Sequence, residues 1–154
     1  EWTPPSDGPE RPCVRVLRAD GTDTGIAFHG VPGGHEFNSF VVGLYNAAGP
    51  GQSIDPALAE AIAAIDRPLD LQIVVALSCT MCPELVIAAQ KIAASNPLVT
   101  AKVYDVNHFP ELRERYKIMS VPCLIINKAQ VAFGKKTLGQ LLELLAEPEA
   151  GQTG

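Results

Sequence analysis

Two cysteines separated by two residues, Cys79 and Cys82, constrain the fold of this chain more than any other feature. They follow residues 69–77, which are almost unbroken in apolar character after Gln72, as is typical of a strand covered on both faces. After them, apolar residues recur at helical spacing over residues 85–93, and Pro83 suits the first turn of that helix. The pair is therefore predicted at a strand-to-helix junction, a context typical of redox-active cysteines.

This junction gives the two sulfurs different roles. A sulfur at a helix N-terminus lies near unpaired N–H groups and the positive end of the helix dipole, which favour the thiolate. We therefore expect Cys79 to be the nucleophile, and Cys82 to resolve a mixed disulfide by attacking Cys79. Half of a zinc site and an inert structural disulfide stay open as alternatives. A zinc site needs two more ligands, and the other Cys and His residues form no second closely spaced pair.

The N-terminal third is predicted to form a β-hairpin and two helices. Short β-prone runs at residues 14–18 and 24–29 flank an Asp-Gly turn signal. Asp55 and Pro56 form a capping pair that predicts a helix ending near residue 66. Between the hairpin and that helix, five apolar residues recur at helical spacing, so we expect their shared face to be buried. These residues are Phe37, Phe40, Val41, Leu44 and Tyr45.

The elements after the cysteine pair complete a βαβα-ββα order, which predicts an α/β fold with a mixed sheet flanked by helices. Thr137 and Gln140 form a capping-box pattern ahead of the last helix. Pro122 begins the last hairpin and would face the cysteine pair. If cis, it would leave backbone groups free for an extended substrate; alternatively, it only begins an edge strand. The remaining predicted elements are a strand at 100–106, a helix at 110–116, and strands at 124–127 and 131–133.

A short internal repeat links the two halves of the chain. Residues 11–16 match residues 121–126, and residues 26–30 match residues 131–135. Each match belongs to the order proline, strand, turn, strand, helix. Only the second copy is preceded by a βαβ segment, so the first is a partial unit.

The repeat divides the chain into four predicted parts. The partial unit without the cysteine motif occupies residues 12–51, and the complete redox unit occupies residues 52–146. A linker or trimmed boundary at residues 1–11 is rich in Pro and acid, unlike a signal peptide, and residues 147–154 form a loose tail. The partial unit would leave a strand edge unpaired, so we expect upstream residues or a homodimer contact to cover that edge.

The composition and net charge of the chain limit the classes of molecule that it could bind. The 154 residues, 47% hydrophobic and 19% charged, suit one domain or two small units that share a core. A formal net charge of −5 argues against nucleic acid or an anionic membrane as partner. No apolar run approaches the ~18 residues of a membrane span. The partner is therefore expected to be a protein. Because a Cys-x-x-Cys pair in a βα context is more often catalytic in a reducing compartment, the chain is expected in the cytoplasm.

With these motifs in place, the chain resembles the N-terminal domain of the alkyl hydroperoxide reductase flavoprotein subunit. That family carries two fused thioredoxin-like folds, and only the second has the cysteines. The matching stretches are residues 28–37, which contain Gly-His-Glu-Phe, residues 77–83, and residues 119–122. The resemblance implies a thiol–disulfide oxidoreductase that relays electrons from a flavoprotein disulfide reductase to a peroxiredoxin. It also implies that Glu36 lies near the cysteines and affects their reactivity. From the residues alone, Glu36 is only a carboxylate in the first turn of a helix, where the helix dipole favours it.

The chain departs from that family in ways that limit the comparison. It has no Gly-x-Gly-x-x-Gly motif, so FAD and NAD(P)H are expected only on a separate or missing reductase domain. The chain itself is expected to hold a redox-active disulfide and no other cofactor or metal. Cys123 follows Pro122 where Thr or Ala is expected, which places a third sulfur near the pair; we expect Cys123 and Cys13 to be small buried hydrophobes. A general glutaredoxin-like reductase and a non-catalytic docking module are the alternative functions.

Overall fold

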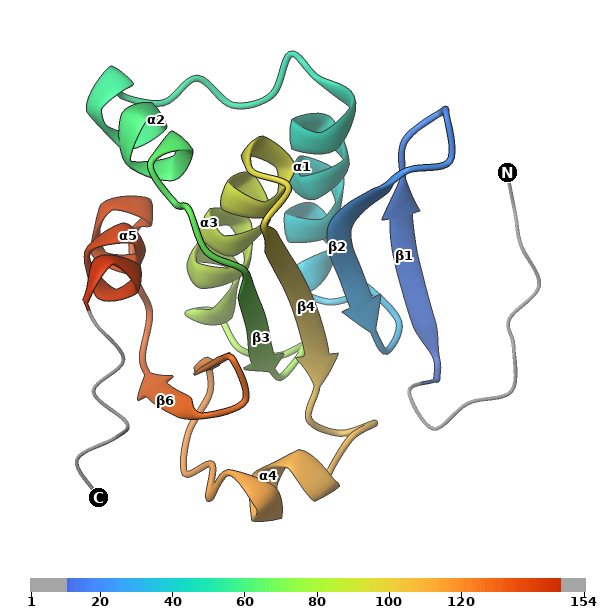
Figure 1. Ribbon diagram of the computed structural model, residues 1–154. Helices are drawn as coiled ribbons and strands as arrows, with labels where there is room; N and C mark the ends of the chain where they lie inside the picture. The colour runs from blue at the N-terminus through green and yellow to red at the C-terminus, as the bar shows by residue number, and fades with distance from the viewer. Residues whose placement is uncertain (1–10, 148–154) are drawn as a thin grey trace.

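The computed structural model describes residues 11–147, which contain one six-stranded mixed sheet in the order β1-β2-β4-β3-β5-β6 (Figure 1). Residues 1–10 and 148–154, most of the predicted linker and tail, lie outside the described residues. The α/β fold predicted from the sequence is confirmed. The strands are β1 (Cys13–Leu17), β2 (Asp23–His29), β3 (Leu69–Val75), β4 (Val99–Asp105), β5 (Cys123–Ile126) and β6 (Gln130–Phe133).

Five helices accompany this sheet in the described part of the chain. Asp55 caps the second of them by accepting a 2.8 Å hydrogen bond from the backbone N–H of Ala57. Thr137 and Gln140 form the predicted capping box at the last one. Within residues 11–147, no helix is both long and apolar enough to cross a membrane. The helices are α1 (Glu36–Ala48), α2 (Pro56–Ala63), α3 (Cys82–Ser95), α4 (Glu111–Arg115) and α5 (Leu138–Ala146).

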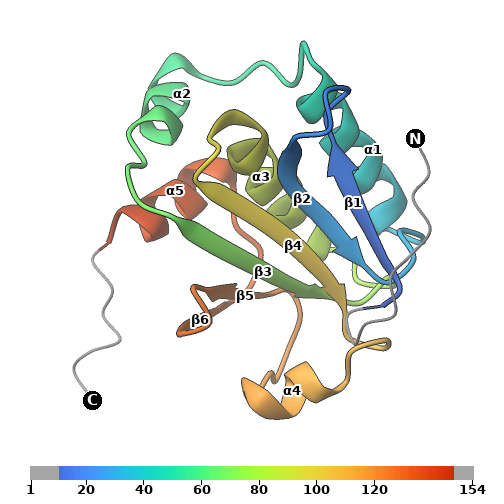
Figure 2. The ribbon, with the colours of Figure 1, turned by 45° about the vertical axis from the view of Figure 1, so that its right-hand side comes forward.

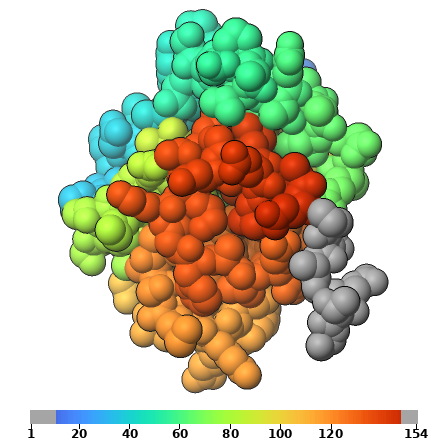
Figure 3. Space-filling view, turned by 90° about the vertical axis from the view of Figure 1, so that its left-hand side faces the viewer, coloured from blue at the N-terminus to red at the C-terminus, as the bar shows by residue number. Residues whose placement is uncertain are grey.

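Both faces of the central strand β3 are covered, and the strand is apolar from Ile73 to its end. Its side chains alternate between two cores, as the period of a strand requires. Ile73 packs into the core that includes residues of α3 and α5, whereas Val74 packs into a second core with Leu112 of α4. In the space-filling view of the α5 side, α5 lies next to α2 and to the chain segment that precedes α2 (Figure 3).

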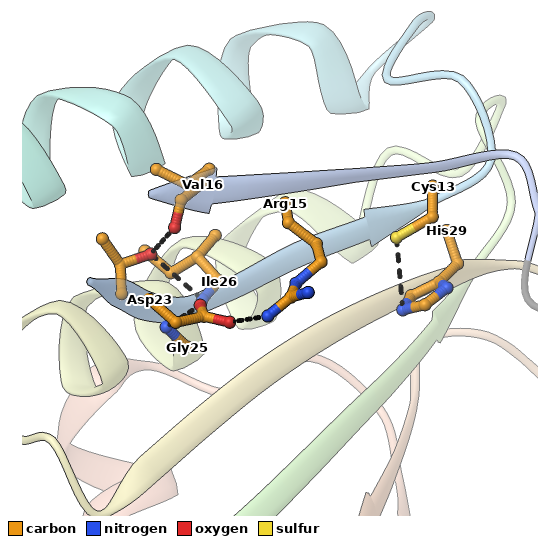
Figure 4. A network of polar contacts seen from close by, with 8 residues as sticks. Cys13, Arg15, Val16, Asp23, Gly25, Ile26 and His29 are labelled. Atoms are coloured by element: carbon orange, nitrogen blue, oxygen red, sulfur yellow. Dashed lines mark hydrogen bonds and ion pairs between the residues drawn. The ribbon is translucent and has the colours of Figure 1, made fainter. Parts of the chain in front are cut away.

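The hairpin of the first unit joins the sheet of the second unit through β2, which pairs in parallel with β4. The β1–β2 hairpin is closed by polar contacts: Arg15 forms an ion pair with Asp23, and Thr24 donates a 2.6 Å hydrogen bond to the Val16 carbonyl (Figure 4). β1 is therefore the edge strand at this end of the sheet, opposite β6 at the other edge. The sheet is continuous across the predicted boundary between the two units.

The repeat is visible in the hydrogen bonds of the two hairpins. The Gly30 N–H donates to the Pro12 carbonyl at 2.7 Å, and the Gly134 N–H donates to the Pro122 carbonyl at 3.1 Å. The peptide bonds preceding both prolines are cis, as is the Gly49–Pro50 bond.

The strand register corrects the sequence alignment of this repeat by one residue. Cys13 pairs with His29, and Cys123 pairs with Phe133. His29 therefore corresponds to Phe133, and not to the following residue as the alignment predicted. The first hairpin is also irregular between Arg15 and Leu17. This irregularity and the longer turn obscure the correspondence in sequence.

The expectation for α1 is wrong, because its apolar face is exposed. Most of its apolar side chains face solvent, while Glu36, Ser39 and Asn46 are buried. Close packing against α3 explains this arrangement: a Cβ added at Gly43 would lie 2.5 Å from the Oε1 atom of Gln90. Small and polar residues thus occupy the narrow contact between the two helices.

Candidate active site

Cys79 lies in the turn between β3 and α3, and Cys82 is the first residue of α3. The turn is held by a 3.0 Å hydrogen bond from the Cys79 N–H to the Ala76 carbonyl. Both sulfurs are free thiols; Cys79 is half-buried and Cys82 is fully buried. The structure therefore places both cysteines at the predicted strand-to-helix junction, with the first more accessible than the second.

The environment of Cys82 keeps its thiol protonated. Burial is the main cause of its raised pKa, and a hydrogen bond to the Cys79 sulfur acts in the same direction. A hydrogen bond with the backbone of Ala76 lowers the pKa of Cys82 to a smaller extent. Cys79 is thus the more accessible sulfur and Cys82 the buried one, as expected of a nucleophile and a resolving thiol.

Pro122 lies beside the cysteine pair, although a strand and a helix separate them in sequence. β5 pairs antiparallel with β3, and this pairing brings the chain that precedes β5 next to the turn after β3. The Cys79 Sγ atom lies 4.0 Å from the Val121 carbonyl oxygen. The Val121–Pro122 peptide bond is cis, and Pro122 is buried.

Glu36 reaches the site because the loop before α1 docks on the end of β3. The His35 N–H donates a 2.9 Å hydrogen bond to the Leu77 carbonyl. Gly34 allows this approach: its φ is +54°, and an added Cβ would lie 2.5 Å from the Leu77 carbonyl oxygen. Glu36 follows directly as the first residue of α1. The first unit thus contributes a carboxyl group next to the turn of the second unit.

This carboxyl group is buried without an ordinary partner. Glu36 has 0% relative exposure, and neither of its oxygens has a hydrogen-bond partner among the described residues. Burial raises the pKa of Glu36 to about 7; the nearby Ser39 hydroxyl lowers it to a smaller extent, although no hydrogen bond of ordinary geometry joins them. The charge of Glu36 also contributes to the raised pKa of Cys82. The two groups are therefore electrostatically coupled.

Cys123 does not join the cysteine pair. It packs in the core on the α4 side of the sheet, whereas Cys82 packs in the core on the opposite side. Burial raises the pKa of Cys123 to about 11. Cys123 is the buried hydrophobe that we expected, but the expected proximity to the pair is wrong. Cys13 is only half-buried, and its Sγ atom lies 3.8 Å from the Nε2 atom of His29 (Figure 4).

Sequence reasoning missed how the site is held together. The contacts of His35 and Gly34 with Leu77 join residues far apart in sequence, and only the glycine pair at residues 33–34 could have suggested a close approach.

Among residues 11–147, no group of three or more His, Cys, Asp or Glu side chains is arranged to hold a metal ion.

Residues 69–146, about half of the chain, match the family model of the thioredoxin domain. The chain is also 33% identical, over 135 residues, to the F subunit of alkyl hydroperoxide reductase from Pseudomonas aeruginosa. That match covers 88% of this chain and 25% of the relative. The chain thus spans about a quarter of the length of this curated relative.

Two solved structures agree with the fold. The NTD_N/C domain of the alkylhydroperoxide reductase AhpF from Enterococcus faecalis has a TM-score of 0.85 at 43% identity, over 89% of this chain and 66% of that one. A protein disulfide oxidoreductase from Aeropyrum pernix has a TM-score of 0.76 at 23% identity, over 88% of this chain and 58% of that one. The second comparison bears on the fold alone.

Proposed function

Since this chain belongs to the thioredoxin domain family, we propose that it relays electrons from a flavoprotein disulfide reductase to a peroxiredoxin or a similar protein disulfide. The similarity to F subunits of alkyl hydroperoxide reductase supports the broader role of a thiol–disulfide oxidoreductase. The observation that carries the proposal is the unequal pair at the start of α3: an accessible Cys79 beside a buried, protonated Cys82. The relay would operate in the cytoplasm, where the dithiol can be regenerated.

The first step is attack of the Cys79 thiolate on the disulfide of the acceptor protein. A Cys79–acceptor disulfide forms, the acceptor disulfide breaks, and its second sulfur leaves as a thiolate. The short chain ahead of Pro122 lies alongside Cys79, where the Val121 carbonyl is within 4.0 Å of Sγ. An extended segment of the acceptor would bind along this chain, because exposed backbone groups recognise extended peptides.

The second step is attack of Cys82 on the Cys79 sulfur. Cys82 must first lose its proton, which its buried position opposes. Glu36 can accept a proton near neutral pH because burial raises its pKa to about 7. The attack forms the Cys79–Cys82 disulfide and releases the acceptor as a second thiolate, so one acceptor disulfide is reduced and one chain disulfide is formed. The donor reductase, carrying FAD and NAD(P)H on its own domain, then restores the dithiol.

Turnover with one reductase and two acceptors tests this function. A peroxiredoxin and a generic protein disulfide are offered separately to the chain, and NAD(P)H oxidation is followed. We expect at least a tenfold preference for the peroxiredoxin, and Cys79→Ser abolishes turnover with both acceptors. Cys82→Ser accumulates a mixed disulfide with the peroxiredoxin, visible by mass spectrometry. Cys13→Ser is the matched control, a half-buried cysteine outside the pair, and retains turnover.

Three outcomes separate the alternatives. Equal turnover with both acceptors would replace the dedicated relay by a general disulfide reductase. Absence of turnover with both, while the chain still binds the peroxiredoxin, would indicate a docking module. Loss of activity in Cys13→Ser as severe as in Cys79→Ser would overturn the assignment of the pair.

A further inference from the structure

The charges of this chain are distributed unevenly along its sequence. Between Glu114 and Glu143 there is no Asp or Glu, and this stretch, residues 115–142, is here named the basic segment. Its Lys and Arg residues are Arg115, Lys117, Lys128, Lys135 and Lys136. The basic segment therefore carries a formal charge of +5, which leaves −10 for the rest of a chain whose net charge is −5. Such a separation creates a positive potential wherever the basic residues gather in the fold.

The first part of the basic segment lies at the end of the sheet that carries Cys79. The segment begins at the last residue of α4, and α4 lies below the arrowheads of β3 and β4 (Figure 2). Cys79 follows the end of β3, and its Sγ atom lies 4.0 Å from the Val121 carbonyl oxygen. Lys117 is exposed in the loop that leads from α4 to Val121, and the next residue, Ile118, is buried in the core on the α4 side. This burial holds Lys117 close to the loop beside Cys79.

Two further lysines reach the same end of the sheet from β6. Because β5 and β6 are antiparallel, the chain that leaves β6 returns to the start of β5. The Gly134 N–H donates a 3.1 Å hydrogen bond to the Pro122 carbonyl, and Lys135 and Lys136 follow directly. The Lys136 Nζ atom donates a 2.9 Å hydrogen bond to the Phe133 carbonyl. The chain around Pro122 therefore has basic residues in its own loop and in the chain beside it.

The charges of these lysines are not neutralised within residues 11–147. Lys117 and Lys135 are exposed, and neither they nor Lys136 form an ion pair with another residue of that range. The exposed carboxylate of Glu84, in the first turn of α3, lines a pocket together with Leu58 of α2. The three lysine charges are therefore available to a partner that approaches Cys79.

We propose that the acceptor segment that binds along the chain ahead of Pro122 is acidic, and that Lys117 and Lys135 select it by its charge. The inference rests on the proposed function, because it names the class of acceptor for the same thiol. Backbone groups can hold an extended segment of almost any sequence, so they give little selectivity. A positive potential adds selectivity, because it favours encounter with acidic segments and disfavours encounter with basic ones. The acceptor is thus a protein disulfide with Asp or Glu residues close to its cysteines.

Reduction of three designed peptides tests this selectivity. Each peptide contains the same disulfide-bonded cysteine pair, flanked on both sides by Asp, Asn or Lys, and the reduced chain is the reductant. The Cys79–Cys82 dithiol becomes a disulfide as the peptide disulfide becomes a dithiol. Parallel rates with a small uncharged dithiol correct for the effect of the flanking charges on the peptide cysteines. At about 20 mM ionic strength we expect a corrected preference of about tenfold or more for the Asp peptide over the Lys peptide, falling below about twofold at about 0.5 M.

Charge reversal at single lysines locates the selectivity. Lys135→Glu should lower the preference for the Asp peptide by about threefold or more, and its combination with Lys117→Glu should abolish the preference. The rate with the Asn peptide should stay within about twofold of the wild-type rate, because neither lysine takes part in the exchange of sulfurs. Lys136 is left unchanged because its ammonium group holds the chain that follows β6.

Lys128→Glu is the matched control, since it makes the same change in net charge at another exposed lysine of the basic segment. Lys128 lies at the opposite end of β5 from Pro122, where the Asn127 N–H donates a 2.8 Å hydrogen bond to the carbonyl of Asp70 near the start of β3. The two single variants are compared at about 0.1 M ionic strength, where charges more than about 10 Å apart are largely screened. Lys128→Glu should keep the wild-type preference.

The outcomes distinguish this inference from the function on which it rests. A preference for the Asp peptide that Lys135→Glu weakens and Lys128→Glu retains supports the inference. Equal corrected rates with all three peptides overturn it and leave a disulfide reductase without charge selectivity. A preference that both variants weaken equally also overturns it, because net charge alone would then explain the effect. Reduction of none of the peptides overturns both the inference and the thiol–disulfide function, provided that circular dichroism shows a folded chain.

Discussion

The two hairpin-and-helix copies share a backbone pattern but not an environment. Both place a glycine N–H on the carbonyl of the leading proline, at Gly30 and Pro12 and at Gly134 and Pro122. In the second copy, β5 lies between two strands and α5 packs against α2 and α3. In the first copy, β1 is an edge and the apolar side of α1 faces solvent. The same local structure therefore forms with and without neighbours on its outer side.

This difference separates what a sequence repeat specifies from what it does not. Turn chemistry and strand alternation are local, so both copies reproduce them. Burial depends on the partners of each element, and these differ. Residues at equivalent positions should consequently have unequal effects on stability, which mutation can measure.

The largest difference is expected between the leucines of the two helices. Leu141→Ala removes a fully buried side chain from the main core and should lower the free energy of unfolding by about 2–5 kcal/mol. Leu44→Ala removes an exposed side chain and should cost less than about 1 kcal/mol. Urea unfolding provides the measurement. Equal losses would show that the apolar face of α1 that contains Leu44 is buried like that of α5.

A smaller difference is expected between the cysteines that follow the two prolines. Cys123→Ser places a hydroxyl in an apolar core and should lower the free energy of unfolding by about 1–3 kcal/mol. Cys13→Ser lies at the sheet edge, half-buried, and should change it by about 0.5 kcal/mol or less. Thermal or urea unfolding of the reduced variants distinguishes them. A loss at Cys13 as large as at Cys123 would mean that β1 is buried like β5.

The parts of the fold predicted correctly from sequence depend on neighbours along the chain. The strand before Cys79, the Asp55 cap and the Thr137 capping box each arise within a few residues, and the structure contains all three. The α1 prediction failed because helical spacing identifies residues that share a face, not which face is covered. The covered face depends on the contact between Gly43 and Gln90, which no local pattern reveals.

The candidate site divides in the same way. Cys79 and Cys82 were found from their spacing and context, and their different burial agrees with the roles proposed for them. The burial of Glu36 was not predictable from residues, because it depends on the docking of Gly34 on Leu77. Cys123 was placed near the pair from its position after a proline, but strand alternation directs it to the other face of the sheet.

The smallest expected effect concerns the starts of the two helices. α5 begins with a satisfied capping box, whereas α1 begins with the buried carboxyl of Glu36, whose pKa is raised to about 7. A raised pKa means that the folded chain binds the proton more tightly than the unfolded chain, in which Glu has a pKa near 4.5. Glu36 therefore favours folding least when ionised, and stability should fall as pH rises from about 4.5 to about 7.

Glu36→Gln removes this titration while keeping the shape of the side chain. Relative to the variant, the wild-type chain should lose on the order of 2 kcal/mol of unfolding free energy between pH 5 and pH 8, because each pKa unit corresponds to about 1.4 kcal/mol. Urea unfolding at several pH values measures the difference, and Glu143→Gln on the exposed side of α5, which retains Glu36, is the control that follows the wild-type profile. If wild type and Glu36→Gln follow parallel pH profiles, Glu36 is ionised in the fold like an ordinary surface carboxylate. It could then not take the proton of Cys82 near neutral pH, and the contribution of the first unit to the chemistry would reduce to positioning.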